Sequence, residues 1–311
     1  MKCTFCSREA IYKVRDRRIY LCNYHFRQYI ETEVESTVSR FEMLKNVKKV
    51  LTCVSGGKDS VVMLKILHKI CSDRDIKILG LVIDVCIGDY SKRQVEYAVK
   101  NFKELGVDYV VVKLEDFGIC LENPDRIERL LKRPICSICG IVKRYIMNKV
   151  ALEEKCDVVA TGHNLIDISQ YALMNILTGN LEYLVKLKPK VEGSEKIVTR
   201  IRPLYFIDEK EIELYAETSN LEYLKDQCPY STRHNYRKMT IQDMLRMYIR
   251  EIEDRNPGFF RKFLENLNSR IIPILEKHVY EKYSTCKICG MPSKGDICTF
   301  CKIITTLRRY G

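Results

Sequence analysis

The chain has 311 residues, of which 46% are hydrophobic and 30% charged. This balance excludes a disordered chain, and no apolar run reaches the roughly 20 residues that a membrane-spanning helix needs. The start, MKCTFC, lacks the apolar segment of a signal peptide, which predicts a soluble, cytoplasmic protein with no membrane partner. The net charge of +12 favours a polyanionic partner such as a nucleic acid, or describes a basic enzyme without one.

Residues 1–30 predict a small N-terminal zinc unit. Cys3 and Cys6 are separated by two residues, and Cys22 and His25 repeat this spacing. Three sulfur donors and one nitrogen form a donor set that suits a closed, structural Zn²⁺ site. Residues 31–47 follow as a predicted linker helix with apolar residues at helical spacing.

Short apolar runs alternate with helical patterns between residues 48 and 162. Strands are predicted at 48–54, 76–84, 107–114 and 156–162, and helices at 59–70, 91–105 and 139–154. Apolar strands separated by helices are typical of βαβ units, which place a parallel sheet between two layers of helices. The predicted fold class is therefore α/β, and residues 48–230 are assigned to this domain.

The pattern becomes helical after residue 201, and residues 231–280 are assigned to a helical, basic extension. A loop and a helix are predicted within 202–220, a basic helix to about residue 255, and another helix to about residue 278. In the segment 231–251, tyrosines can stack on extruded bases while cations meet phosphates. Alternatively, a helix turns its methionines and leucines inward and its charges outward, and we expect both on different faces.

Residues 281–311 predict a second zinc unit. Its four cysteines are Cys286, Cys289, Cys298 and Cys301, in two pairs of the same spacing, and they suit a closed Zn²⁺ site. Units this small have little core and are expected to fold only with metal. Arginines accompany both units and either contact RNA or form solvated basic faces: Arg15, Arg17 and Arg18, then Arg308 and Arg309.

A third cysteine group consists of Cys136 and Cys139, before a predicted helix, and the distant Cys228. Three thiolates can hold three irons of a [4Fe–4S] cluster and leave the fourth iron open. The spacing also allows a persulfide and disulfide pair of Cys139 and Cys228, or buried thiols. The other cysteines mostly lie in apolar runs and are predicted to fill the core: Cys53, Cys71, Cys86, Cys120 and Cys156.

The hexapeptide SGGKDS, residues 55–60, follows a predicted strand and opens a predicted helix. Its glycines let the backbone approach phosphates, with amides at a helix N-terminus. Lys58 adds a positive charge, Asp59 a carboxylate suited to Mg²⁺, and Ser60 a hydroxyl donor. The longer P-loop pattern GxxxxGK[ST] is absent, yet an ATP site is predicted at Val54, Ser55, Gly56, Gly57, Lys58, Asp59 and Ser60.

Polar residues at two strand ends extend the predicted nucleotide site. Gly162 can let adenosine lie close to the backbone, and His163 follows it at the carboxyl end of a strand, where ligands bind in open α/β sheets. Asp84 ends the strand 76–84, where the adenine or ribose would rest.

SGGKDS resembles the PP-loop of N-type ATP pyrophosphatases, which split ATP into AMP and pyrophosphate. Four further segments resemble the tRNA 2-thiolation enzymes of the TtcA/TtuA group: RPICSICGIVKR (133–144), ATGHNLID (160–167), RIRPLYFIDEKEIELYA (200–216) and DQCPYS (226–231). The terminal zinc units point within this group to the 2-thiouridine branch, which acts at tRNA position 54 or 34. The resemblance covers essentially the whole chain and implies an adenine nucleotide α-hydrolase-like domain.

This resemblance implies a transferase that adenylates the C2 oxygen of a tRNA uridine and replaces it with sulfur. The implied cofactors are ATP, Mg²⁺, two Zn²⁺ and a [4Fe–4S] cluster on Cys136, Cys139 and Cys228. The implied partners are tRNA, a second copy of the chain, and a sulfur donor, either a thiocarboxylated ubiquitin-like carrier protein or sulfide. The alternatives are a non-catalytic or divergent paralogue that binds ATP and tRNA, and a tRNA 2-thiocytidine synthetase.

The resemblance also implies three catalytic residues. Asp59 assists Mg²⁺ and pyrophosphate, Lys143 matches a lysine that contacts the nucleotide, and Asp167 matches an acid that acts as metal ligand or base. Related enzymes usually read GHNLDDEA where this chain reads GHNLIDIS, so Ile166 and Ile168 replace two acids. This departure favours a change of activity or substrate.

Overall fold

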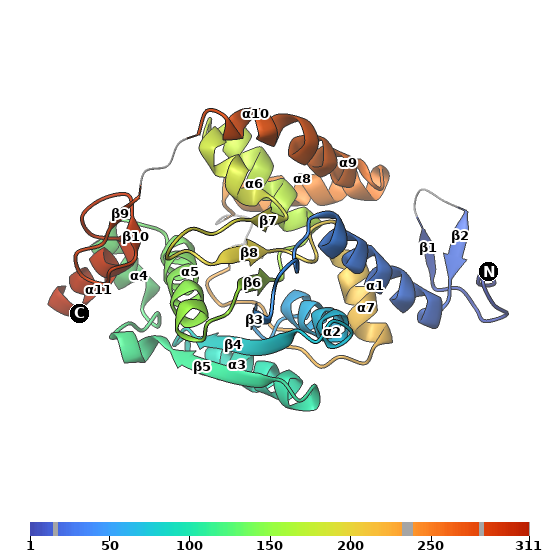
Figure 1. Ribbon diagram of the computed structural model, residues 1–311, viewed down its shortest axis with the longest axis horizontal. Helices are drawn as coiled ribbons and strands as arrows, with labels where there is room; N and C mark the ends of the chain where they lie inside the picture. Colours follow the sequence, from blue (N-terminus) through green and yellow to red (C-terminus); the bar gives the residue numbers. More distant parts are fainter. Residues whose placement is uncertain (15–17, 232–238, 280–282, 311) are drawn as a thin grey trace.

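The computed structural model describes residues 1–14, 18–231, 239–279 and 283–310. A six-stranded sheet lies at the centre, and the two chain ends lie at opposite ends of the molecule (Figure 1). None of the described helices combines the length and apolarity needed to cross a bilayer.

The sheet has the strand order β5-β4-β3-β6-β8-β7. Its strands are β3 (Lys49–Cys53), β4 (Lys77–Asp84), β5 (Asp108–Lys113), β6 (Val158–Thr161), β7 (Lys190–Val191) and β8 (Thr199–Ile201). All neighbours are parallel except β7 and β8, which pair antiparallel. The carboxyl ends of the parallel strands therefore meet at one edge of the sheet, where open α/β sheets bind ligands.

Helices and shorter elements connect and cover the sheet. The main helices are α1 (Asn23–Arg40), α2 (Lys58–Ser72), α3 (Gly88–Glu104), α4 (Pro124–Leu131), α5 (Ile135–Glu153), α6 (Leu165–Leu177), α7 (Glu209–Thr218), α8 (Ile241–Arg255), α9 (Phe259–Asn266), α10 (Ile272–Glu276) and α11 (Thr299–Tyr310). The shorter elements are β1 (Tyr12–Val14), β2 (Ile19–Leu21), β9 (Ser284–Thr285), β10 (Pro292–Ser293), η1 (Leu114–Phe117), η2 (Leu181–Leu187) and η4 (Leu267–Ile271).

Alternate residues of the central strands face two different cores. Leu51 and Leu79 pack with Val142 of α5, whereas Val50 and Val158 pack with residues of α1 and α2. Because both faces are covered, the strands are apolar in runs rather than in alternation. Gly80 in β4 has a packing reason as well, since a Cβ atom there would lie 2.3 Å from the ring of Phe102 in α3.

The predicted α/β class and the four predicted strands are confirmed. Two predicted helix starts are wrong. The helix expected from residue 31 begins at Asn23, because residues such as Phe26 and Ile30 are already buried against the sheet. The helix expected from residue 139 begins at Ile135, so Cys136 and Cys139 lie within its first turns rather than before it.

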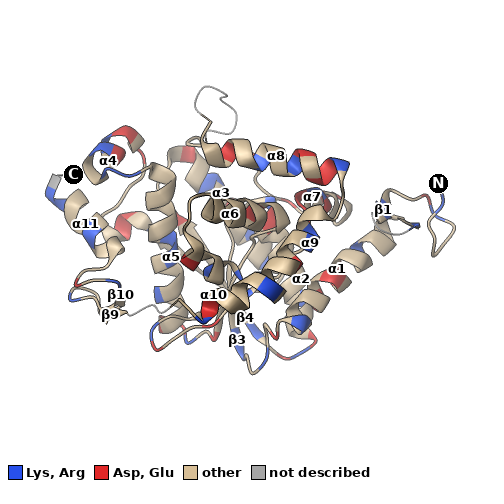
Figure 2. Cartoon of the chain, turned by 90° about the horizontal axis from the view of Figure 1, so that it is seen from above, with Lys and Arg blue, Asp and Glu red and all other residues tan. Residues whose placement is uncertain are grey.

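Helix α8 matches the predicted arrangement only in part: Ile249 and Leu245 pack in the core, but the methionines face outward and one charge faces inward. Met244 and Met247 are 39% and 50% exposed, whereas Arg246 is 5% exposed. The acidic and basic residues spaced along α8 are visible from above (Figure 2). Ion pairs of Arg246 with Asp167 and Glu209 explain why this charge turns inward. Residues 232–238 of the predicted basic segment lie outside the described residues.

The prediction that all five remaining cysteines fill the core is wrong for two of them. Cys53, Cys71 and Cys156 are buried, but Cys86 and Cys120 form a disulfide. The bond ties the segment after β4 to the segment after η1, across a sequence separation of 34 residues.

We expect this disulfide to stabilise the fold. Closing a loop of this length lowers the entropy of the unfolded chain by an amount worth about 3–4 kcal/mol. The variant Cys120→Ser should therefore unfold at a lower urea concentration than the oxidised wild type, and dithiothreitol should remove the difference. If iodoacetamide labels both cysteines in denatured but unreduced protein, the disulfide is absent and the prediction is wrong.

Candidate active site

The hexapeptide 55–60 links the carboxyl end of β3 to the first turn of α2, as predicted. Gly56 has a φ of +76°, and a Cβ atom there would lie 2.5 Å from the carbonyl oxygen of Gln94. A side chain is therefore excluded by both conformation and space. Gly57 has an ordinary φ of −79° and precedes α2, where free backbone N–H groups favour an anion.

Side-chain hydrogen bonds hold this loop in shape. The Ser60 hydroxyl donates to the Gly57 carbonyl at 2.9 Å and accepts from the Ser55 N–H at 3.0 Å. Ser60 is 7% exposed, so in this state it closes the loop rather than facing solvent. Val54 is buried among Val61 and Val82, which leaves only its backbone for a ligand.

The residues predicted at the other strand ends surround the loop. A Cβ atom on Gly162 would lie 3.0 Å from backbone atoms of Asp59 and Ser60, so β6 and the first turn of α2 approach each other closely there. His163 Nδ1 lies 2.9 Å from the Thr161 hydroxyl. Asp84 accepts a hydrogen bond from the Cys86 N–H at 2.9 Å and so caps the turn after β4.

A cluster of ion pairs lies beside the loop. Lys58 Nζ is 3.1 Å from carboxylate oxygens of both Asp59 and Glu209. Arg246 bridges Asp167 at 2.6 Å and Glu209 at 2.9 Å, and Arg250 also pairs with Glu209. Sequence reasoning missed Glu209, Arg246 and Arg250, because only the packing of α7 and α8 brings them to the loop.

This site shifts the pKa values of two carboxyl groups in opposite directions. Burial raises the pKa of Asp59 to about 6; Lys58 opposes this, and the nearby Asp167 and Glu209 carboxylates add to it. Burial also acts to raise the pKa of Glu209, but Arg246, Lys58 and Arg250 overcome it and lower that pKa to about 2. Glu209 therefore stays ionised and anchors the cations, whereas Asp59 carries a carboxylate that a bound cation would stabilise.

We expect Glu209→Gln to destabilise the fold by about 3 kcal/mol at neutral pH, because it leaves Lys58 and Arg250 short of their shared carboxylate. The folded-state pKa of Glu209 is lowered from 4.5, so its stabilisation is present above pH 4.5 and is lost as the pH falls toward 2. Urea unfolding at pH 7 and pH 3 measures this. If the variant and the wild type differ in their free energy of unfolding by the same amount at both pH values, the account is wrong.

Asp167 is also held by its own helix. Its backbone N–H donates to Asn164 Oδ1 at 3.0 Å, and its carboxylate accepts from the Asn164 N–H, which forms a capping box at the start of α6. Ile166 and Ile168 are each 1% exposed and belong to the hydrophobic core under α6. The two isoleucines, at the positions where the resemblance led us to expect acids, therefore pack in the core of this chain.

The third cysteine group is brought together by tertiary structure. Cys136 and Cys139 lie in α5, and Cys228 lies in the segment between α7 and α8. Desolvation raises the pKa of Cys136, and the neighbouring Cys228 and Cys139 raise it further. The three thiols therefore lie close enough to influence one another's ionisation, although they are not among the ligand sets whose atoms all lie within 4.8 Å of one another.

The segment that carries Cys228 is attached to the phosphate loop. The Leu224 N–H donates to the Gly56 carbonyl at 2.8 Å, and Asp226 pairs with Arg93 of α3. Tyr90, also on α3, lies beside the third cysteine group: burial raises its pKa to about 12, and Cys228 and Cys139 add to the shift. The predicted nucleotide loop and the predicted cluster ligands are therefore neighbours.

Each terminal unit gathers four metal-ligand atoms within 4.8 Å. The first set is Cys3, Cys6, Cys22 and His25, and the second is Cys286, Cys289, Cys298 and Cys301. Burial opposes ionisation of Cys3, but backbone N–H groups of Phe5 and Cys22 lower its pKa to about 6. Both predicted donor sets are thus assembled, and each could hold one metal ion.

The arginines near these units have separate outcomes. Arg308 Nη2 donates to the Phe117 carbonyl at 3.4 Å, so it packs against η1. Arg15 and Arg17 lie outside the described residues.

Two residues predicted to bind the nucleotide, Lys143 and His163, line a cavity of about 700 Å³ to which the hexapeptide 55–60 does not contribute.

These features define an α/β nucleotide-binding protein whose phosphate loop lies at the carboxyl edge of a parallel sheet. A family model described as a PP-loop domain matches residues 28–246. The chain belongs to the PP-loop family of tRNA 2-thiolation enzymes, the TtcA/TtuA group, and this confirms the predicted resemblance and the predicted transferase class.

Individual relatives match almost the whole chain. The tRNA-5-methyluridine(54) 2-sulfurtransferase of Pyrococcus horikoshii is 40% identical over 97% of this chain and 93% of its own length. The enzyme of the same name from Thermotoga maritima is 36% identical over 97% and 96%. The U34-tRNA thiolase NcsA from Methanococcus maripaludis, solved with its [4Fe–4S] cluster, matches with a TM-score of 0.80 and 31% identity, over 100% of this chain and 97% of that one.

Proposed function

We propose that the chain is an ATP-dependent tRNA 2-sulfurtransferase that converts a uridine to 2-thiouridine. The observation that carries the proposal is the hydrogen bond between Leu224 and Gly56, because it joins the segment bearing Cys228 to the phosphate loop. A site that activates an oxygen with ATP and a site that supplies sulfur must be adjacent for one enzyme to perform both steps. Position 54 is the first candidate, since relatives at 40% and 36% identity carry that name.

The proposed reaction has two steps. The uridine O2 attacks the α-phosphorus of ATP, and pyrophosphate leaves with the electron pair of the broken P–O bond. Sulfide then attacks C2, and the C2–O bond breaks so that AMP departs with the original oxygen. The N–H groups at the start of α2, together with Lys58, would hold the departing pyrophosphate.

Further residues of the cluster have proposed roles around the nucleotide. Asp59 and Asp167 would hold Mg²⁺, which when bound neutralises phosphate charge, and Asp167 can instead act as a base. Lys143 would contact the nucleotide from α5. Gly162 would let the nucleotide lie against the backbone of β6, and Asp84 would face the ribose or adenine. Arg246 would have to release Asp167 for either of its roles.

The three metal groups have different proposed uses. Cys136, Cys139 and Cys228 would hold a [4Fe–4S] cluster, which when bound supplies an open iron for sulfide. The terminal sets would each hold a structural Zn²⁺. A tetrahedral Zn²⁺ with Zn–S bonds of about 2.3 Å places sulfurs about 3.8 Å apart, and the pairs Cys6–Cys22 and Cys289–Cys298 are both 3.7 Å apart.

The test is anaerobic purification, metal analysis and a thiolation assay. We expect about four irons and about two zinc ions per chain. With ATP, Mg²⁺, sulfide and unmodified tRNA, nucleoside mass spectrometry should detect 2-thiouridine, accompanied by AMP and pyrophosphate. Transcripts that replace the uridine at position 54 or at position 34 distinguish the two targets.

Other outcomes identify the alternatives. Formation of 2-thiocytidine would assign the other branch, and tRNA binding without AMP release would indicate a non-catalytic paralogue. Replacing sulfide with a thiocarboxylated carrier protein tests the donor, and light scattering tests the proposed homodimer. The division into a PP-loop domain over 48–230, a linker, a helical extension and two zinc units also stays a proposal, which limited proteolysis would test.

A further inference from the structure

The 700 Å³ cavity has a basic wall and lies between α5, α6, η2, β8 and the C-terminal unit. Its cationic side chains are Lys143, Arg144, Lys186, Arg200 and Arg202. Among the described residues, its wall contains no Asp or Glu side chain. The residues that line the cavity thus contribute cations and no carboxylate, and this excess of positive charge in the wall favours an anionic ligand.

Three guanidinium groups of the wall keep hydrogen-bonding capacity. Within the described part of the chain, the guanidinium groups of Arg144 and Arg200 form neither a hydrogen bond nor an ion pair. Arg202 is 7% exposed and donates to the carbonyls of Lys186 and Lys188, but its Nε has no partner among the described residues. Arg144 is exposed and Arg200 half-buried, so the cost of a buried donor without a partner falls on Arg202 Nε. A ligand with several acceptor oxygens would satisfy this donor and pair with the other two guanidinium groups.

The positive charges of these arginines also destabilise the charged forms of their neighbours. Burial lowers the pKa of Arg200, and the nearby Arg144 lowers it further. Burial lowers the pKa of Arg202 to about 10, and Arg200 contributes to that shift. An anion between the guanidinium groups would relieve both effects, since an opposite charge favours the charged form.

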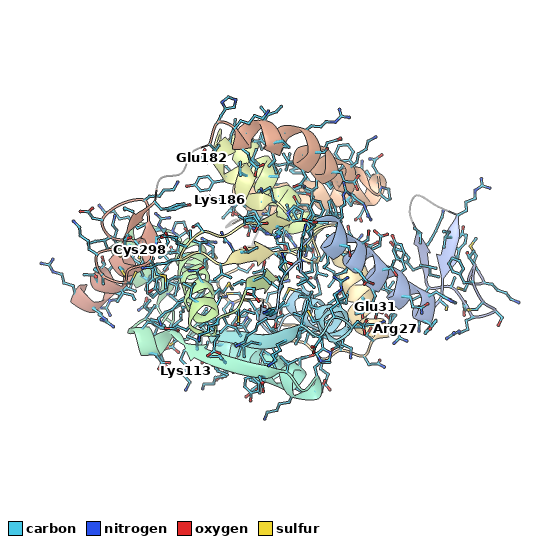
Figure 3. All side chains as sticks on the ribbon, in the orientation of Figure 1. Arg27, Glu31, Lys113, Glu182, Lys186 and Cys298 are labelled. Carbon is cyan, nitrogen blue, oxygen red and sulfur yellow. A yellow bond between two sulfur atoms is a disulfide. The ribbon has the colours of Figure 1, made fainter. Side chains whose placement is uncertain are left out.

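Aromatic rings accompany the positive charge. Tyr171 and Tyr183 line the cavity and are 40% and 42% exposed. The ammonium groups of Lys186 and Lys294 lie 5.5 and 5.6 Å from the centre of the Tyr183 ring. Lys186 lies on the side of the molecule where α6 faces the C-terminal unit (Figure 3). Exposed tyrosines beside cations suit a base and its phosphate.

We propose that this cavity receives a nucleotide of the RNA substrate, with a phosphate on Arg144 and Arg200 and the base against Tyr171. The proposal rests on the proposed function and deepens it. His163 belongs to the same wall and directly follows Gly162, which lies close to the backbone of Asp59, so this end of the cavity lies near the nucleotide loop although the loop does not line it. The cavity volume lies within the range of about 300–1,000 Å³ that is typical of small-molecule binding sites.

A protein tail that ends in a carboxylate is the competing occupant. Such a tail would contribute one carboxylate and no base. The exposed tyrosines would then have no ring to stack on, and some of the guanidinium N–H groups would have no acceptor. A phosphodiester has several acceptor oxygens and is flanked by bases, so the wall favours RNA.

Equilibrium binding of fluorescent, unmodified tRNA tests the proposal without requiring catalysis. Arg200→Gln should weaken binding about tenfold and lower the salt dependence by about one counterion. The matched control Arg74→Gln removes an arginine that follows α2 at the opposite edge of the sheet and should bind like wild type. A second pair compares Lys186→Gln with the control Lys113→Gln on β5, and these two lysines lie far apart in Figure 3.

A cross-linking experiment locates the nucleotide. Transcripts carrying 4-thiouridine at the target position should cross-link under ultraviolet light to peptides from 165–187. Unchanged tRNA binding by folded Arg200→Gln, or cross-links confined to other segments, would overturn the proposal. So would an effect of Arg200→Gln confined to assays with a carrier protein as donor, which would assign the cavity to a protein tail. Failure of the proposed function is separate, because wild type would then bind tRNA without thiolating it.

Discussion

Cys228→Ala is expected to abolish 2-thiouridine formation and to remove the brown colour of the anaerobically purified protein. Cys228 is brought beside Cys136 and Cys139 only by the folded chain, and two thiolates from one helix cannot hold a cluster with one open iron. We expect the thiolation rate to fall at least about 100-fold and the iron content to fall with it. Nucleoside mass spectrometry and iron analysis measure the two losses.

The matched control for this prediction is Cys71→Ala. Cys71 is a buried cysteine of α2 that packs in the core near α1, so its loss removes a thiol without touching the proposed ligands. The control should keep its iron and its activity apart from some loss of stability. If Cys228→Ala retains full iron content and thiolates tRNA, the three cysteines do not form the proposed site.

Asp59→Asn is expected to lower the thiolation rate about 10²–10³-fold while the fold and both terminal metal units remain intact. Asp59 lies in the first turn of α2 with Lys58 on one side, and Asp167 and Glu209 contribute to its raised pKa. Removing its charge removes a proposed ligand for Mg²⁺. It also leaves Lys58 with Glu209 as its remaining ion-pair partner among the described residues, which draws the lysine away from the phosphates. The measurement is AMP and pyrophosphate release with tRNA.

Asp73→Asn supplies the control, because Asp73 caps the other end of the same helix and is exposed. Its activity should equal that of wild type, and circular dichroism should show that both variants fold. Iron and zinc contents should be unchanged in Asp59→Asn. Retained AMP release in Asp59→Asn would remove Asp59 from the proposed catalytic residues.

The local features of the site could be predicted from the sequence because each depends on neighbours along the chain. The hexapeptide 55–60 needed only a strand before it and a helix after it, and both are present. The terminal metal sets needed only pairs of ligands separated by two residues. The alternation of apolar runs and helical patterns was sufficient for a parallel sheet with both faces covered.

Contacts between distant segments could not be predicted in the same way. Glu209 and Arg246 are ordinary surface charges in sequence, and their pairing with Lys58 and Asp167 depends on how α7 and α8 pack beside the loop. The burial of Arg246 on α8 follows from the same ion pairs. The sequence predicted that the methionines of α8 face inward, but Met244 and Met247 are exposed, and the inward side holds Ile249 together with the paired Arg246.

The disulfide and the basic cavity show the same limit. Cys86 and Cys120 carry no spacing motif, and they pair because the segments after β4 and η1 meet. Arg144 and Arg200 come from α5 and β8 and share a wall only after the sheet forms. The sequence by itself thus determined the family, the sheet type and the terminal ligand sets, since these follow from residue order and short-range spacing. The tertiary structure alone decided which distant charges and thiols meet, because electrostatic pairing depends on separation in space.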